Sequence, residues 1–127
     1  MDKQVFKKIL TERHQEVREW KLLENLCAIH LMKQFSNTDE PRLFYYSRNM
    51  EVDFYVPEAG LAVQASYDIY DDETRRREVA ALTTLHKAFP LQRAVIVTRD
   101  QEEQITEGAL TIEVIPVWKW LLEVYFV

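Results

Sequence analysis

The sequence predicts an α/β fold in which helices flank a mixed β-sheet, with the element order α-β-β-β-α-β-β-α. Three features support this prediction. A long N-terminal stretch without Gly or Pro favours helix, and three short β segments follow it. The segment Leu61–Thr98 then has a β-α-β pattern, which predicts a crossover between two parallel strands. The chain has 127 residues, a length that suits one hydrophobic core.

The first expected element is a long or broken helix over Asp2–Phe35. A polar stretch, Thr11–Glu19, interrupts its apolar pattern. From Trp20 to Leu31 apolar residues recur at helical spacing, so the second half of the helix is expected to be buried. We therefore divide the chain into a helical extension, residues 1–19, and an α/β domain, residues 20–127.

Three short strands are expected next, after a turn at Ser36–Pro41. Leu43–Ser47 is rich in aromatic residues. Glu51–Val56 alternates between apolar and polar residues, as a half-buried strand does. The turn Pro57–Gly60 leads into a third strand, Leu61–Tyr67. These strands predict a meander at the start of the sheet.

The second half of the chain predicts a helix, two more strands and a final helix. Asp71 or Asp72 is expected to cap the helix that runs to about Ala88, because acidic residues suit a helix N-terminus. The remaining elements are a buried strand at Arg93–Thr98, an acidic loop with room for a short strand at Asp100–Gly108, a strand at Thr111–Ile115, and a last helix opened by Pro116.

Composition excludes several classes of protein. Only two glycines occur, so neither a P-loop nor a dinucleotide-binding glycine fingerprint is possible. The net charge is -5, with 14 acidic and 8 basic residues from Leu43 onward, which opposes nucleic-acid binding. A single cysteine excludes an internal disulfide and paired-cysteine zinc sites. No long apolar run predicts a signal peptide or a membrane span, so we expect a cytoplasmic protein.

Several polar residues lie where the pattern favours apolar ones. Glu24 lies on the apolar helical face, either at its edge, paired with Lys21, or buried with a partner. Asp53 lies mid-strand, where it either faces water or begins a site for a hard cation such as Mg²⁺. If its strand pairs with the next one, Gln64 and Ser66 lie near it.

This arrangement resembles the PD-(D/E)XK nuclease fold, a restriction-endonuclease-like core. It is most similar to one branch, the C-terminal nuclease-like domain of archaeal-type AAA-superfamily ATPases. The resemblance covers most of the chain from about residue 20. The matching stretches are KLLENLCAIHL (Lys21–Leu31), LFYYSRNMEVDF (Leu43–Phe54), VQASYD (Val63–Asp68), ETRRREVAAL (Glu73–Leu82), AVIVTRD (Ala94–Asp100) and IEVIPVWKWLL (Ile112–Leu122).

The resemblance implies a site in which Mg²⁺ is held by a helix Glu and by acids on the second and third strands, with a Lys near the attacking water. Glu24 and Asp53 match the helix Glu and the second-strand acid. Gln64 stands in place of the third-strand acid, and Ser66 in place of the Lys. The implied catalytic positions are therefore Asp53, Gln64 and Ser66, and the implied metal ligands are Glu24, Asp53 and Gln64.

These departures predict a catalytically inactive domain that acts in binding or assembly and needs no cofactor, its partner being a protein or a second copy of itself. One alternative is an active nuclease, a Mg²⁺-dependent phosphodiester hydrolase in which Arg76, Arg77 or Lys87 replaces the missing Lys. The opposing interpretation of Arg75–Arg77 is a solvated group that pairs with Asp72, Glu73 and Glu78. Another alternative is an oligomerisation or protein-interaction module with no nucleic-acid role, for which the many aromatic residues would provide a surface.

Overall fold

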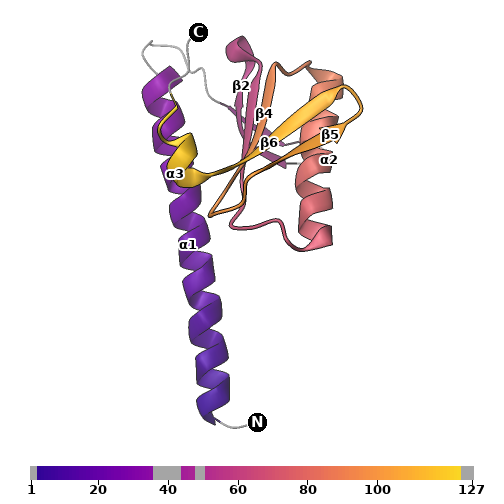
Figure 1. The fold of residues 1–127 in the computed structure, drawn as a ribbon. Coiled ribbons are helices and arrows are strands. Elements are labelled where there is room, and N and C mark those ends of the chain that lie inside the picture. The colour runs from indigo at the N-terminus through magenta and orange to yellow at the C-terminus, as the bar shows by residue number, and fades with distance from the viewer. Residues whose placement is uncertain (1–2, 36–43, 48–50, 124–127) are drawn as a thin grey trace.

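The structure, a computed structural model, describes the backbone of residues 3–35, 44–47 and 51–123 and the side chains of residues 18–35 and 51–123. It confirms the α/β fold with a mixed sheet (Figure 1). The elements are α1 (Lys3–Phe35), β1 (Phe44–Ser47), β2 (Glu51–Val56), a short 3-10 turn η1 (Pro57–Ala59), β3 (Leu61–Ala65), α2 (Asp72–Ala88), β4 (Arg93–Thr98), β5 (Glu103–Glu107), β6 (Leu110–Pro116) and α3 (Val117–Trp120).

The sheet has six strands in the order β1-β2-β3-β4-β6-β5. The pairs β1–β2, β2–β3 and β5–β6 are antiparallel, whereas β3–β4 and β4–β6 are parallel. The predicted crossover is therefore confirmed, with α2 joining β3 to β4. Asp71 caps α2, and its carboxylate accepts a hydrogen bond from the Thr74 backbone N–H at 3.0 Å.

Two elements differ from the sequence prediction. The acidic loop contains a full strand, β5, which pairs with β6 and places Ile105 against the core, so the sheet has one strand more than the predicted order. The final helix is a single turn that ends at Trp120, which is fully buried. Trp118, in the same turn, is 62 % exposed.

Two cores lie on opposite faces of the sheet. Helix α2 covers one face, and the second half of α1 covers the other together with α3 (Figure 1). The α1 side contains Leu23, Cys27, Leu31 and Phe35, as the apolar pattern predicted. The first half of the continuous helix α1 extends beyond the sheet (Figure 1). The boundary proposed near residue 20 thus lies within one helix.

Gly60 is needed where η1 turns into β3. It has a left-handed φ of 59°, and a Cβ placed there would lie 3.1 Å from the Gln92 backbone nitrogen. Gly108 has a similar φ of 61°, but a Cβ there would meet nothing within 4 Å. We expect Gly108→Ala to cost about 1 kcal/mol, from backbone strain alone, and Gly60→Ala about 2 kcal/mol, because a contact must also shift.

Urea denaturation of both variants measures this difference. Equal losses in the two variants would show that the contact with Gln92 relaxes without cost.

Candidate active site

A pocket of about 770 Å³ lies where α1, α2, β2 and β3 meet. Three of the residues predicted from the sequence, Glu24, Asp53 and Gln64, line it together. The pocket also contains Glu51, which shares a strand with Asp53. Its lining consists of Trp20, Glu24, Glu51, Asp53, Gln64, Ala65, Arg77, Glu78 and Ala81. The convergence predicted for Glu24, Asp53 and Gln64 is therefore present.

Helix α1 brings two side chains to the pocket, one turn apart. The Trp20 indole N–H donates to the Ala65 carbonyl oxygen at 3.2 Å, which ties the helix to the end of β3. Glu24 follows on the same face and is partly buried. Within the described residues it has neither an ion pair with Lys21 nor another partner, so neither the pairing expected at the edge of the helical face nor the buried partner is present.

Gln64 joins β2 to β3 beyond the end of their backbone ladder. The paired register ends at Phe54 and Val63. Past that point the Asp53 backbone N–H donates to Gln64 Oε1 at 2.8 Å, and Gln64 Nε2 donates to the Glu51 carbonyl oxygen at 3.1 Å. Both ends of the carboxamide thus satisfy backbone groups of β2, and the side chain is 1 % exposed. Gln64 therefore has a structural role at the junction of β2 and β3.

Asp53, on β2, in turn forms a hydrogen bond with the backbone of β3. Its Oδ2 accepts a hydrogen bond from the Ala65 backbone N–H at 2.9 Å. The pKa of Asp53 is raised to about 6, mainly by burial and also by the charges of Glu24 and Glu51, while the Ala65 hydrogen bond opposes the shift. The carboxyl group therefore holds the backbone of β3 and faces a strongly negative pocket.

Ser66 does not line the pocket. It is buried, and its hydroxyl donates to the Asp68 carbonyl oxygen at 2.9 Å. The expectation that Ser66 lies with Asp53 and Gln64 in one site is therefore wrong. Ser66 lies one residue past the end of β3, where its backbone N–H donates to the Val97 carbonyl oxygen at 2.9 Å and its hydroxyl bonds to Asp68 rather than to a group of the pocket.

Helix α2 contributes Glu78, which the sequence analysis treated only as a surface partner of arginines. Glu78 is 9 % exposed and lines the pocket. Its pKa is raised to about 7, mainly by burial and also by the charges of Asp53 and Glu24, while Arg77 opposes the shift. A signal for Glu78 existed, because it shares the helical spacing of the buried residues Leu82 and Leu85. It is a polar residue at an apolar position, as Glu24 is.

The three arginines of α2 have separate environments. Arg77 lines the pocket with Asp53, whereas Arg76 lines a second cavity, with Lys87, on the outer side of α2. Arg75 pairs with Glu103 of β5 rather than with the acids of its own helix. Of the three cations proposed to replace the missing Lys, only Arg77 reaches the Asp53 pocket.

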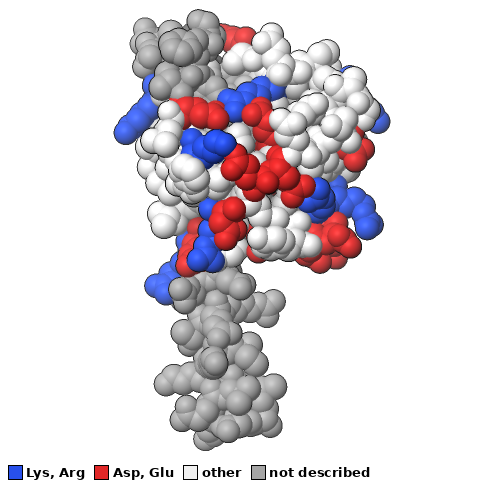
Figure 2. Space-filling view, viewed as in Figure 1, with Lys and Arg blue, Asp and Glu red and all other residues white. Residues whose placement is uncertain are grey.

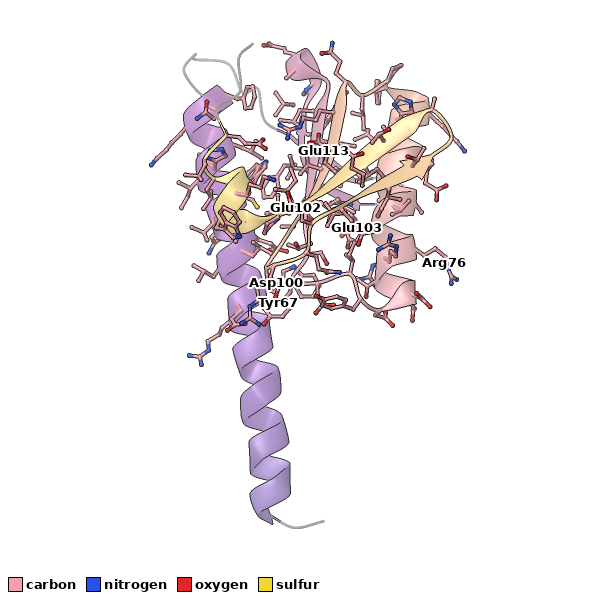
Figure 3. The ribbon with its side chains drawn as sticks, in the orientation of Figure 1. Tyr67, Arg76, Asp100, Glu102, Glu103 and Glu113 are labelled. Atoms are coloured by element: carbon pink, nitrogen blue, oxygen red, sulfur yellow. The ribbon has the colours of Figure 1, made fainter. Side chains whose placement is uncertain are left out.

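The acids on the β5–β6 side of the molecule are balanced by cations. Figure 2 shows acidic and basic side chains side by side on this face, and Figure 3 labels Glu102, Glu103 and Glu113 there. Glu113 pairs with Arg93 at 2.6 Å, Glu102 with Lys119, and Glu103 with Arg75. Three of the acids after Leu43 are therefore paired with cations on this face, which leaves the acidic surplus of the segment unchanged.

The site does not fit Mg²⁺ in the way that the resemblance implies. Gln64 has both ends of its carboxamide on the β2 backbone, and Asp53 has one oxygen on Ala65. In the described part of the chain, no three His, Cys, Asp or Glu side chains lie close enough to hold one metal ion. The pocket is an acidic, partly apolar depression, and among the described residues one guanidinium, that of Arg77, lies at its wall.

Comparison with known proteins yields one family. No curated protein and no solved structure matches the chain. Among the helices that the structure describes, none has the length and apolar character needed to cross a bilayer. A family model, described as a domain of unknown function (DUF4143), matches residues 21–120, a range that contains every residue of the pocket except Trp20. The chain thus belongs to the DUF4143 family.

Proposed function

We propose that this chain is a degenerate relative of the PD-(D/E)XK nucleases that has no catalytic activity and acts in binding or assembly. One observation carries the proposal: both ends of the Gln64 carboxamide form hydrogen bonds with the backbone of β2. A nuclease of this type needs an acid at that position to hold the metal. Here the position stabilises the junction of two strands.

The loss of charge supports the same conclusion. Metal-dependent phosphodiester hydrolysis needs cations that stabilise the charge developing on phosphate. Ser66 is neutral, buried and bonded to Asp68, so it supplies no cation to the pocket. Four acidic residues, Glu24, Glu51, Asp53 and Glu78, line the pocket instead, and their negative charge opposes a phosphate group.

The restriction-endonuclease-like ancestry and the link to AAA-superfamily ATPases are part of this proposal and rest on the matching sequence stretches. The topology of the sheet, in which α2 connects the parallel strands β3 and β4, is compatible with this ancestry. Assembly is compatible with the apolar side chains exposed on α1 and near α3. These are Leu22, Ile29, Met32, Trp118 and Leu122.

A second candidate function is that of an active nuclease with a rearranged site. Arg77 favours it, because this guanidinium lines the same pocket as Asp53 and could replace the missing Lys. The two candidates differ in a simple prediction. We expect no cleavage of single- or double-stranded DNA or RNA with Mg²⁺ or Mn²⁺, and no difference between the natural chain and Asp53→Asn.

Cleavage assays on the purified chain test this prediction, with metal-free reactions as the blank. The proposal is wrong if cleavage needs the divalent metal and disappears in both Asp53→Asn and Arg77→Ala. Metal-dependent cleavage that persists in both variants would identify a contaminating nuclease, so the pair of variants is the essential control.

A further inference from the structure

The carboxylates of the pocket lack the cationic partners that the surface acids have. Among the described residues that line the pocket, the four acids Glu24, Glu51, Asp53 and Glu78 stand against one guanidinium, that of Arg77. Within the described residues none of these four forms an ion pair, whereas Glu102, Glu103 and Glu113 each do. Like charges gathered in a partly buried space repel one another, and water screens them less there than at the surface.

Among the four acids of the pocket, Glu78 gives the strongest evidence for a ligand. Its side chain lines the pocket and is 9 % exposed, yet in the described part of the chain it has neither a hydrogen bond nor an ion pair. Most of this side chain is removed from water, and a carboxylate that loses water without gaining a partner is costly. A cationic group that enters the pocket would satisfy Glu78 and relieve the repulsion among the other three acids.

The walls and size of the pocket indicate what kind of cation fits. Trp20 offers an indole that Ala65 holds in place through its N–H, and Ala65 and Ala81 add small apolar surfaces. The volume of about 770 Å³ suits an organic group rather than a bare ion. A basic side chain combines an aliphatic stem, which packs on apolar walls and an aromatic ring, with a head that binds carboxylates.

We propose that this pocket binds the side chain of an arginine or lysine presented by a partner protein, with Glu78 as the principal contact for its charged head and Trp20 as the wall for its stem. This inference rests on the proposed function, since it names the chemistry of the partner that a non-catalytic domain would bind. It reassigns the remnant of the catalytic pocket to the recognition of a positive charge.

Arg77 gives the proposal a specific test. Its guanidinium lies in the same pocket and repels an incoming cation. Removing it should strengthen the binding of a basic side chain, whereas removing it would weaken the binding of a phosphate. The effect of Arg77→Ala therefore has opposite signs for the two kinds of ligand.

The experiment titrates the full chain with capped arginine and capped lysine, followed by NMR of the Trp20 indole N–H and by calorimetry. Capped citrulline, a neutral isostere of arginine, is the ligand control. We expect saturable binding of the basic probes only. Glu78→Gln should weaken it about tenfold and Arg77→Ala should strengthen it about threefold. Glu107→Gln, in an exposed acid that lines a different cavity, should leave it unchanged.

The inference is overturned by the absence of binding or by equal binding of citrulline. It is also overturned if Arg77→Ala weakens the binding of the basic probes, or if Glu78→Gln and Glu107→Gln weaken it equally. Spermidine and Mg²⁺ are added as competitors. If spermidine alone binds, or if Mg²⁺ binds with the same dependence on Glu78 and displaces arginine, the site takes a free polyamine or a metal and the proposal fails. Absence of both binding and cleavage rejects this inference and leaves the proposed function standing.

Discussion

We expect Glu78→Gln to stabilise the chain: at about pH 8 its free energy of unfolding should be about 3 kcal/mol higher than that of the natural chain. Burial and the charges of Asp53 and Glu24 raise the pKa of Glu78 from 4.5 to about 7, so the folded state resists ionisation of this carboxyl group. Glutamine has a similar shape and never ionises. The variant therefore removes a cost that the natural chain carries above neutral pH.

The direction of the pH dependence follows from proton binding. Between the ordinary pKa of Glu78 and its raised value, the folded chain keeps a proton that the unfolded chain has lost. Stability contributed by this group is thus present at low pH and falls as the pH rises toward about 7. Asp53, with its pKa raised to about 6, acts in the same direction. Most carboxylates have the opposite effect, because ion pairs lower their pKa.

Urea denaturation between about pH 5 and about pH 8 measures this effect. The natural chain should lose stability over that range, and Glu78→Gln should lose much less, retaining only the part due to Asp53. Glu107→Gln is the control, since Glu107 is exposed on β5. A natural chain whose stability is constant or rises over this range would show that Glu78 ionises freely.

The second large effect is expected for Gln64→Leu, which should lower the free energy of unfolding by about 3 kcal/mol. Leucine has a similar size but leaves the Asp53 backbone N–H and the Glu51 carbonyl oxygen without their partners. Both backbone groups lie where the ladder between β2 and β3 has ended, so no neighbouring strand group replaces the carboxamide. The loss follows from two unsatisfied backbone groups.

The variant Gln64→Glu separates the structural role from the ancestral one. A carboxylate accepts the Asp53 N–H but cannot donate to Glu51, and it adds a negative charge beside Asp53. We expect Gln64→Glu to have a lower free energy of unfolding than the natural chain, and the loss to be larger at about pH 8 than at about pH 5. Gln104→Leu, at an exposed position on β5, is the control for replacing a glutamine. A stable Gln64→Leu variant would show that the carboxamide is not needed at the strand junction.

Much of the fold could be predicted because its signals are local. The apolar spacing in α1, the alternation in β2 and the acidic start of α2 each depend on neighbouring residues only. The β-α-β pattern then predicted that β3 and β4 are parallel strands joined by a crossover. The strand β5 was seen only as an option within an acidic loop. Its identity depends on pairing with β6, which is a contact between two segments and not a property of either.

The residues of the candidate site also fall into two groups, those that local patterns predicted and those that depend on tertiary packing. Glu24 and Asp53 could be found as polar residues in apolar patterns, and the hairpin pairing predicted that Gln64 would lie near Asp53. Glu78 and Arg77 could not be placed in that pocket, because the rotation of α2 about its axis is set by how Leu82 and Leu85 pack on the sheet. Ser66 was misplaced because the end of a strand depends on its partners.

The sequence by itself determined which chemistry is missing from this protein: two glycines exclude the common nucleotide loops, and Gln64 and Ser66 replace an acid and a lysine. Only the tertiary structure decided what stands in its place. Gln64 holds two strands together, and Glu78 lies buried among other acids without a described partner. The physical reason is that burial and hydrogen-bond satisfaction depend on neighbours from α1, α2, β2 and β3, which meet only when the chain folds.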